Sequence, residues 1–346
     1  MKVGILTSEK SVSLQRVSND IKNVLMRNGF KDVKTVLSPI ADPYVYKPLD
    51  AVIIIMAFDT FWAVPYFYIA YRLKSMGKKY VFYTTIEGFP IRYQNDGWIY
   101  RELEFVPNSE FTAECLRTAG ARVKDVIYHG IDVDSVYGFR FRRDAVRRKL
   151  GLKDDDFMVL YIAGDYMRKG HAEFSAVIKE VSERDKTIKF VVLTKGDAVE
   201  YYSGLSNCWV IPGFGTLSEA DIYGLYHACD LYAQASLSEG FGMPVLEALA
   251  AGKPVVHADY APLTEITSKD TSFRVSVKGK SYVKDVGGIM YILHHYDPKE
   301  FADAIIHAKD EVVKNRDEFE AKCVSRARRF SVWEIYKSFI RELEDG

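Results

Sequence analysis

Two glutamates with seven residues between them, Glu239 and Glu247, stand in the segment CDLYAQASLSEGFGMPVLEALAAGKPVV (229–256). An ionised carboxylate accepts two hydrogen bonds from a diol, so this pair suits a ligand that carries two sugar rings. Gly240 and Gly242 let the backbone of the intervening loop approach a ligand, and the unpaired N–H groups of a helix that starts there bind anions. The segment therefore predicts a site for a sugar nucleotide, with its diphosphate between ribose and transferred sugar.

The residues around the two glutamates predict the elements that position them. An apolar run at 231–235 favours a buried strand, and Pro244 suits the first turn of a helix. Gly252 suits the end of that helix, and Pro254 prevents its continuation. For Glu247 alone the simpler interpretation is an acid in the first turn of an ordinary helix, where the helix dipole stabilises it.

A second segment, AGDYMRKG (163–170), follows another expected strand and opens a helix. Its cations Arg168 and Lys169 are unfavourable beside the positive end of the helix dipole, unless an anion lies between them. A diphosphate that leaves a sugar develops negative charge, which such cations and the backbone at Gly164 would stabilise. The alternative is a solvated basic turn, which the segment in isolation would favour.

The first segment closely resembles the E-x7-E signature of the large retaining glycosyltransferase family of GT-B fold, glycosyl transferases group 1, family four. That family includes sucrose-synthase-like and mannosyltransferase-like enzymes. The resemblance is strong from about 157 to 270, moderate over 104–132 and weak at the N-terminus. It implies that Glu239 contacts the donor sugar and Glu247 the ribose. It also implies that the backbone contacts sugar and phosphate oxygens at three positions: Gly240, Phe241 and Gly242.

The resemblance extends to the basic segment and to the loops that would hold the base. Lys169 and the glycine after it match the family's Lys-Gly pair, whereas the usual earlier arginine is Asp165 here, so Arg168 is expected to replace it. The base is expected beside two loops that follow strands, at Lys195 and at Phe214. These residues do not reveal which base is bound.

The N-terminal half departs from the family at one expected site residue. Many members carry a histidine in a pattern like T-V-H-G, and the matching string TTIEG (84–88) has Glu87 there. Glu87 could hydrogen-bond the donor sugar or the acceptor, or it could be a plain loop carboxylate, and both interpretations stay open. Six aromatic residues nearby could stack on a sugar or simply belong to the core: Phe61, Trp62, Tyr66, Phe89, Tyr93 and Trp98.

Short apolar runs alternate with helical patterns along most of the chain, which predicts βαβ units and parallel sheets. With the resemblance, this predicts an α/β protein of GT-B fold, with two Rossmann-like domains facing a cleft. We expect an N-terminal acceptor-side domain at 1–138, a charged linker at 139–156 and a nucleotide-sugar domain at 157–328. A C-terminal helix at 329–346 is expected to pack back on the N-terminal domain.

Composition limits the partners and the location. The chain has 346 residues with 47 basic and 47 acidic side chains, so no bulk charge favours a nucleic acid. Four scattered cysteines, no signal segment and no apolar stretch near 18 residues predict a cytoplasmic protein. The arginine-rich stretch 140–148 could touch the inner face of a membrane, although a solvated hinge helix is the simpler interpretation.

The resemblance implies transfer of a hexosyl group, with retention, from a nucleotide-diphosphate sugar to a sugar, a glycan or a lipid-linked acceptor. No cofactor and no metal are expected, because the strings Asp132-Val133-Asp134 and Asp154-Asp155-Asp156 lie in or before the linker. Two alternatives stay open: an epimerase of the same architecture and a non-catalytic module that binds nucleotide sugars. The absence of G-x-G-x-x-G after the first strand argues against a nicotinamide enzyme.

Overall fold

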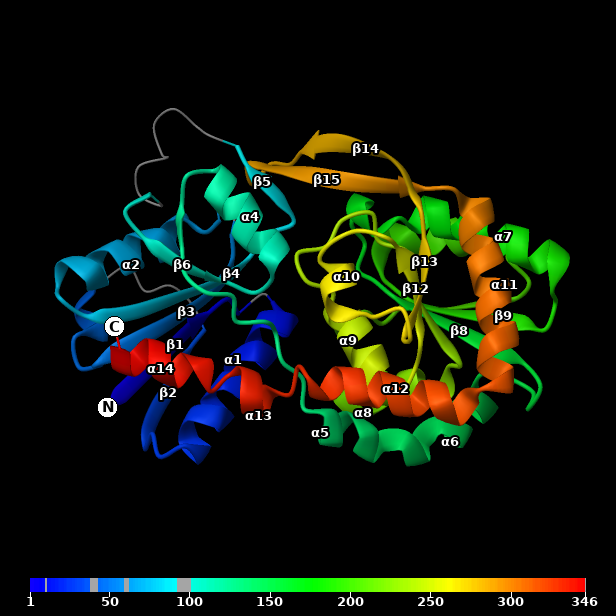
Figure 1. The fold of residues 1–346 in the computed structure, drawn as a ribbon, viewed down its shortest axis with the longest axis horizontal. Coiled ribbons are helices and arrows are strands. Elements are labelled where there is room, and N and C mark those ends of the chain that lie inside the picture. The colour runs from blue at the N-terminus through cyan, green and yellow to red at the C-terminus, as the bar shows by residue number, and fades with distance from the viewer. Residues whose placement is uncertain (10, 38–42, 59–61, 92–100, 346) are drawn as a thin grey trace. The chain divides into compact units, whose positions relative to one another are not determined.

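The computed structural model of the chain divides into two compact units, which are described here one at a time (Figure 1). The structure describes residues 1–9, 11–37, 43–58, 62–91 and 101–345. The first unit consists of Met1–Gly130, Tyr282–Ile292 and Phe330–Gly346, and the second of Ile131–Ser281 and Leu293–Arg329.

The first unit is built on a six-stranded sheet with the order β2-β1-β3-β4-β6-β7, in which the paired strands run parallel. The strands are β1 (Lys2–Thr7), β2 (Asp32–Val36), β3 (Ala51–Ala57), β4 (Lys79–Thr85), β6 (Glu104–Pro107) and β7 (Arg122–Val123). The connections contain α1 (Val12–Arg27), η1 (Pro43–Tyr46), α2 (Val64–Ser75) and α4 (Glu110–Thr118). Ser11 and Ser109 cap α1 and α4 by accepting backbone N–H groups of Leu14 and Thr112, as expected for helix starts.

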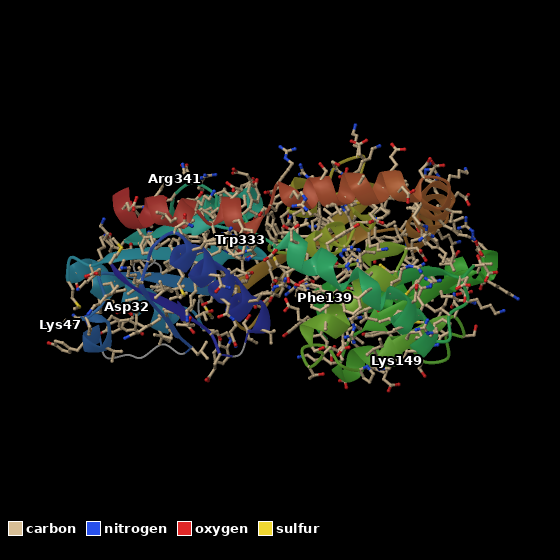
Figure 2. The ribbon with its side chains drawn as sticks, turned by 90° about the horizontal axis from the view of Figure 1, so that it is seen from below. Asp32, Lys47, Phe139, Lys149, Trp333 and Arg341 are labelled. Carbon is tan, nitrogen blue, oxygen red and sulfur yellow. The ribbon has the colours of Figure 1, made fainter. Side chains whose placement is uncertain are left out.

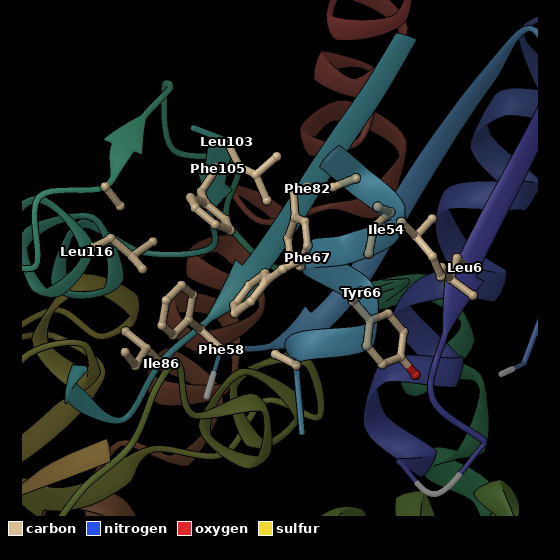
Figure 3. Packing of buried hydrophobic residues seen from close by; sticks show 14 of the residues in the cluster. Leu6, Ile54, Phe58, Tyr66, Phe67, Phe82, Ile86, Leu103, Phe105 and Leu116 are labelled. Carbon is tan, nitrogen blue, oxygen red and sulfur yellow. The ribbon is translucent and has the colours of Figure 1, made fainter. Parts of the chain in front are cut away.

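Two apolar clusters lie in this unit. The first gathers aromatic rings of β4, β6 and α2, among which Phe82 and Phe105 meet edge to face with 5.0 Å between their centroids (Figure 3). Tyr66, one of the six aromatic residues near the N-terminal loops, is buried in this core, and Phe89 packs against it. Trp62 is exposed. The other three, Phe61, Tyr93 and Trp98, lie outside the described residues.

The second apolar cluster includes the C-terminal segment, which forms α13 (Val332–Ile335) and α14 (Ser338–Asp345). Tyr336 is fully buried, and its hydroxyl accepts a hydrogen bond from the Gly130 N–H at 3.0 Å. Arg27 of α1 lies 4.7 Å above the ring of Trp333, which Figure 2 labels. The last residues of the chain thus complete the core of the first unit.

The second unit contains a six-stranded parallel sheet with the order β10-β9-β8-β11-β12-β13. Helices cover both of its faces, so β8, β11 and β12 are buried along their whole length. Its strands are β8 (Phe157–Ile162), β9 (Ile188–Leu193), β10 (Cys208–Ile211), β11 (Leu231–Gln234), β12 (Val255–Ala258) and β13 (Ser272–Val275). Its helices are α5 (Val133–Gly138), η2 (Phe139–Arg142), α6 (Arg143–Lys149), η3 (Met167–Lys169), α7 (His171–Arg184), η4 (Gly196–Tyr202), α8 (Glu219–Ala228), α9 (Met243–Ala250), α10 (Leu263–Ile266), α11 (Pro298–Lys314) and α12 (Arg316–Arg328).

A β-hairpin separates β13 from α11. It consists of β14 (Val277–Lys284) and β15 (Ile289–Tyr296), and β15 pairs antiparallel with β5 (Gly88–Pro90). The pairing joins Ile289 to Pro90 and Tyr291 to Gly88, all within the first unit. Both strands have residues in each unit: 282–284 of β14 and 289–292 of β15 belong to the first unit, and the other residues of the two strands belong to the second.

The fold class is confirmed, because both large sheets are parallel and Rossmann-like. The domain boundaries differ from the expected ones, since the expected linker at 139–156 lies wholly in the second unit and residues 282–292 join the first. The reason is Arg147 of α6, which is buried, hydrogen-bonds the Ala228 carbonyl oxygen and pairs with the carboxylate of Asp230 at 3.2 Å. Among the described residues, no helix combines the length and the apolar character needed to cross a membrane.

Each unit contains a buried histidine that should make it sensitive to acid. Burial lowers the pKa of His129 to about 3 in the first unit and that of His257 to about 4 in the second. The unfolded chain ionises at the ordinary value of 6.5, so stability is full above that pH and falls as the pH drops towards the folded pKa. We expect the free energy of unfolding to fall by about 1.4 kcal/mol per pH unit for each histidine between about pH 6 and 4.5. Urea unfolding over this range measures the slope, and His257→Asn should flatten it; an unaltered slope would contradict the assignment.

Candidate functional site

The two loops that the sequence singles out follow neighbouring strands of the second sheet. Strands β8 and β11 pair in parallel, with Val159 opposite Leu231, and the order of the sheet reverses between them. Ligands of such sheets bind at the carboxyl ends of the strands where the order reverses. Loop 163–170 follows β8 and loop 235–242 follows β11, so both lie at this point.

Glu239 lies in loop 235–242, the acidic loop, and is bonded by residues of loop 163–170, the basic loop. Its Oε1 atom lies 2.5 Å from Lys169 Nζ, and its Oε2 atom lies 3.9 Å from Arg168 Nη1. Arg168 also donates a hydrogen bond to the Ser238 carbonyl oxygen at 3.3 Å. The structure thus brings together three of the four residues predicted to be catalytic, and only 6% of Glu239 is exposed.

The charge state of Glu239 follows from these contacts. Burial alone would raise its pKa, but the positive charges of Lys169 and Arg168 outweigh burial, so the pKa lies below the ordinary value of 4.5. The carboxylate is therefore ionised at neutral pH, and it can only accept hydrogen bonds. This state suits binding of sugar hydroxyls and does not suit proton donation.

Two glycines allow the loops to approach each other and to enter their helices. Gly170 has φ +65°, and a Cβ atom on it would lie 2.4 Å from the Ala235 carbonyl oxygen. Gly242 has φ +104° as the cap of α9, and a Cβ atom on it would lie 2.8 Å from Leu263 Cδ2. Both are left-handed conformations that favour glycine. A side chain at Gly170 would require the two loops to move apart, whereas one at Gly242 would require the Leu263 side chain to shift.

Glu247 lies half-buried on α9 and is oriented by a tyrosine. The Tyr226 hydroxyl of α8 donates a hydrogen bond to Glu247 Oε2 at 2.8 Å. Burial, helped by the charge of Glu247, raises the pKa of Tyr226 well above its ordinary value, so the hydroxyl keeps its proton. Gly240, Phe241 and Gly242, the backbone positions predicted to contact the donor, are buried at the start of the same helix.

The residues predicted to lie beside the base, Lys195 and Phe214, converge with Gly164 on one side of the site. Gly164 follows β8, and a Cβ atom on it would lie 2.9 Å from the Tyr166 ring and 3.1 Å from the Phe214 ring. Lys195 follows β9 and places Nζ 5.7 Å from the centroid of the Phe214 ring. The Asp165 carboxylate accepts the Asp197 N–H at 2.9 Å, which ties the loops after β8 and β9 together.

Two polar residues of this site were not predicted from the sequence. Gln234, the last residue of β11, donates Nε2–H to Glu239 Oε1 at 2.7 Å. His171 lies between the Tyr202 hydroxyl and the Gly164 carbonyl oxygen, at 2.7 and 2.9 Å, and burial lowers its pKa. The neutral ring therefore donates to the carbonyl and accepts from the hydroxyl. A polar residue that ends a buried strand just before Glu239 was the available signal for Gln234.

Glu87, the fourth residue predicted to be catalytic, belongs to the first unit. It is half-buried between β4 and β5. The preceding Ile86 N–H donates to the Thr112 hydroxyl at 3.3 Å, which ties the segment to α4. The choice between a site residue and a loop carboxylate stays open.

The acidic strings near the expected linker have structural partners. Asp132 caps α5 by accepting the Ser135 N–H at 3.1 Å, and Asp134 pairs with Arg328 at 2.7 Å. Asp156 accepts the backbone N–H of Lys153 at 2.8 Å. Within the described part of the chain, no group of three or more His, Cys, Asp or Glu side chains is placed to hold a metal ion.

Known proteins resemble this chain at several levels. The family described as glycosyl transferases group 1 matches residues 142–330. An uncharacterized glycosyltransferase of Sulfolobus islandicus rod-shaped virus 1, named 335, is 29% identical over 98% of this chain and 100% of its own length.

Two solved structures show the same fold over the whole chain. HepE of Anabaena, solved with UDP, has a TM-score of 0.73 at 17% identity and covers 100% of both chains. A glycosyltransferase of Rickettsia africae has a TM-score of 0.76 at 13% identity and covers 99% of this chain and 98% of its own. HepE has also been solved with UDP-glucose. The family match spans more than half of the chain and includes both loops at the reversal point of the second sheet, and the chain therefore belongs to the glycosyl transferases group 1 family, with a GT-B fold.

Proposed function

We propose that this glycosyltransferase takes a hexosyl group from a nucleoside-diphosphate sugar and transfers it, with retention of anomeric configuration, to a hydroxyl group of a sugar, a glycan or a lipid-linked acceptor. The observation that carries the proposal is the buried, ionised Glu239, bonded by Lys169 and flanked by Arg168 at the reversal point of a parallel sheet. The UDP and UDP-glucose complexes of HepE, a protein of the same fold, support a donor of this class.

The proposal assigns a task to each predicted residue of the second unit. Glu239 accepts hydrogen bonds from hydroxyls of the transferred sugar, and Lys169 and Arg168 stabilise the departing diphosphate. Glu247, oriented by Tyr226, accepts hydrogen bonds from the ribose. Two residues, Lys195 and Phe214, flank the base. Five lie beside the sugar and the phosphates: Gly164, Glu239, Gly240, Phe241 and Gly242.

The chemical step balances without a group supplied by a cofactor. The bond from the sugar's anomeric carbon to the diphosphate oxygen breaks, and its electron pair leaves with the diphosphate. The acceptor oxygen bonds to the anomeric carbon from the same face, and the acceptor's proton passes to a departing phosphate oxygen. An ionised Glu239 fits this step because it positions the sugar and takes no proton.

Binding and product analysis test the proposal directly. Isothermal titration with UDP-, GDP- and ADP-sugars should identify a donor class. Product NMR with a panel of sugar and lipid-linked acceptors should then show the donor's anomeric configuration. An inverted product would overturn retention, isomerised donor without acceptor would indicate an epimerase, and binding without turnover over the panel would indicate a non-catalytic module.

Glu247→Gln is expected to weaken donor binding roughly 10- to 100-fold, because a charge-assisted hydrogen bond to the ribose is lost. The matched control is Glu320→Gln, since Glu320 is also half-buried and accepts a tyrosine hydroxyl, that of Tyr137, at 2.9 Å. Titration of both variants with the donor measures the difference. Equal affinities in the two variants would remove Glu247 from the site.

A further inference from the structure

The loop that carries Glu239 is anchored through its peptide carbonyl groups. Residues 235–238 lie between β11 and Glu239, outside any helix or strand, and all four are buried. Buried carbonyl groups require hydrogen-bond partners, which a sheet or helix normally supplies from the backbone. Here most of the partners are side chains from elsewhere in the second unit.

Each of the four carbonyl oxygens accepts a hydrogen bond. The Tyr296 hydroxyl donates to Ala235 O at 3.1 Å, and the Tyr260 hydroxyl donates to Ser236 O at 2.7 Å. His294 donates to the next carbonyl, Leu237 O, from its backbone N–H at 2.8 Å and from Nδ1 at 3.1 Å. The fourth carbonyl oxygen, Ser238 O, accepts the hydrogen bond from the Arg168 guanidinium described above.

The side chains of two of these donors also stack on each other. The rings of Tyr260 and His294 stack with 4.2 Å between centroids and an angle of 2° between their planes. Tyr260 follows β12 and His294 lies in β15, so the stack joins two elements that flank the loop. Both rings are buried. The stacked pair therefore fixes two consecutive peptide groups of the loop against rotation.

The anchored peptide groups end one residue before Glu239. A rotation of the Leu237 or Ser238 peptide would swing the Glu239 side chain away from Lys169 Nζ and Gln234 Nε2, which lie 2.5 and 2.7 Å from its Oε1 atom. The Leu237 N–H belongs to the peptide group whose carbonyl, Ser236 O, accepts from Tyr260, and it donates to Arg168 O at 2.8 Å, so this peptide group links the acidic loop to the basic loop.

We propose that Tyr260 and His294 are positioning residues for Glu239: through Ser236 O and Leu237 O they set the direction in which its carboxylate meets the transferred sugar. This inference rests on the proposed role of Glu239 towards the donor sugar. In this proposal the pair acts on the backbone of the loop and not on the nucleotide, so its loss affects the chemical step and leaves binding of the diphosphate in place.

Substitutions can separate the ring stack from the hydrogen bonds. His294→Phe keeps a ring against Tyr260 and removes the Nδ1 donor, whereas His294→Asn places an amide donor near the position of Nδ1. Both keep the backbone N–H of residue 294, so β15 still bonds the loop. Tyr260→Phe removes only a hydroxyl. Its matched control is Tyr83→Phe in the first unit, which removes a buried hydroxyl that also donates to a backbone carbonyl, Ile127 O, at 2.7 Å.

The first readout is hydrolysis of UDP-glucose without acceptor, or of GDP-mannose or ADP-glucose if the wild-type protein prefers one of them. For His294→Phe and Tyr260→Phe we expect kcat to fall about tenfold, the loss expected from one well-placed hydrogen bond, while the Kd of the sugar-free nucleoside diphosphate changes less than about twofold. His294→Asn should recover most of kcat, and Tyr83→Phe should match the wild type. An unchanged kcat in His294→Phe overturns the inference. A fall in kcat that comes with a similar loss of nucleotide affinity and a lower melting temperature also overturns it.

The second readout does not depend on activity. Amide hydrogen exchange of the peptide 235–242 should be faster in His294→Phe than in the wild type and should return towards the wild-type rate in His294→Asn. If the wild-type protein neither binds nor hydrolyses any of the three donors, the proposed function fails, and with it the role towards a sugar. If donors are turned over but exchange at 235–242 is unaltered in His294→Phe, only the positioning inference fails.

Discussion

Replacing Lys169 with methionine is expected to lower the turnover of a nucleoside-diphosphate sugar by about 10²–10³-fold, because a fixed cation no longer faces the departing diphosphate. The substitution also leaves the buried carboxylate of Glu239 with Arg168 as its remaining cation, 3.9 Å away. Removal of one partner of a buried ion pair costs about 3–5 kcal/mol of stability. Steady-state kinetics and urea unfolding measure the two effects separately.

A second substitution tells loss of chemistry from loss of folding. In Lys169→Met fewer positive charges oppose the effect of burial on Glu239, so the pKa of its carboxyl should rise, and on acidification the carboxyl should take up its proton at a higher pH than in the wild type. The double variant Lys169→Met/Glu239→Gln has no unpaired carboxylate and should regain stability without regaining turnover. Recovery of both quantities in the double variant would show that Lys169 serves only the fold.

Gly170→Ala is expected to lower turnover about 10²-fold, because displacement of a catalytic loop by about 1 Å has an effect of this size. The new Cβ atom would lie 2.4 Å from the Ala235 carbonyl oxygen, so the basic and acidic loops must move apart. Stability should also fall, by about 1–2 kcal/mol for the left-handed backbone and about 1–3 kcal/mol for the overlap. Kinetics with the donor and urea unfolding give both values.

The chain offers a matched control for the backbone conformation. Gly151 has φ +67°, against +65° for Gly170, and a Cβ atom on it would meet nothing within 4 Å. Gly151→Ala should therefore show the conformational cost alone and keep full turnover. If the two alanine variants behave alike, the close approach of the two loops has no bearing on activity.

Much of the fold and part of the candidate site could be predicted from local sequence. Alternating apolar runs and helical patterns are enough to predict two parallel sheets, because the pattern of each βαβ unit lies within a short stretch of sequence. The position of Glu239 beside Lys169 was predictable for a similar reason. Glycines, a proline and charges within two short segments mark loops at strand ends, and the reversal of the sheet order places those loops together. The roles of these residues towards a donor stay predictions.

The remainder depends on contacts that no local pattern encodes. Tyr260 and His294 act through backbone carbonyl groups, which any suitably placed donor could satisfy, so their residue types do not mark them in the sequence. The division of the chain into its two units could not be predicted from local sequence either. A charged stretch such as 139–156 suggests a linker until the burial of Arg147 beside Asp230 is seen. That residues 282–292 join the first unit depends on strand pairing with β5.

The strand β15 has a consequence for how the sequence can vary. Its first residues pair with β5, directly after Glu87, and a Cβ atom on Gly88 would lie 2.1 Å from the Met290 carbonyl oxygen. His294, the third residue after that pairing, faces Leu237. A slip by a single residue turns every side chain of a strand to its other side, so an insertion or deletion within 289–294 would misdirect His294. The hairpin tip is less constrained, because Val286 is 90% exposed, whereas Asp285 and Gly288 on either side of the tip bond Ile289 and Ile91. In descendants of this chain, variation in loop length should therefore accumulate at 286–287 and stop abruptly at Ile289.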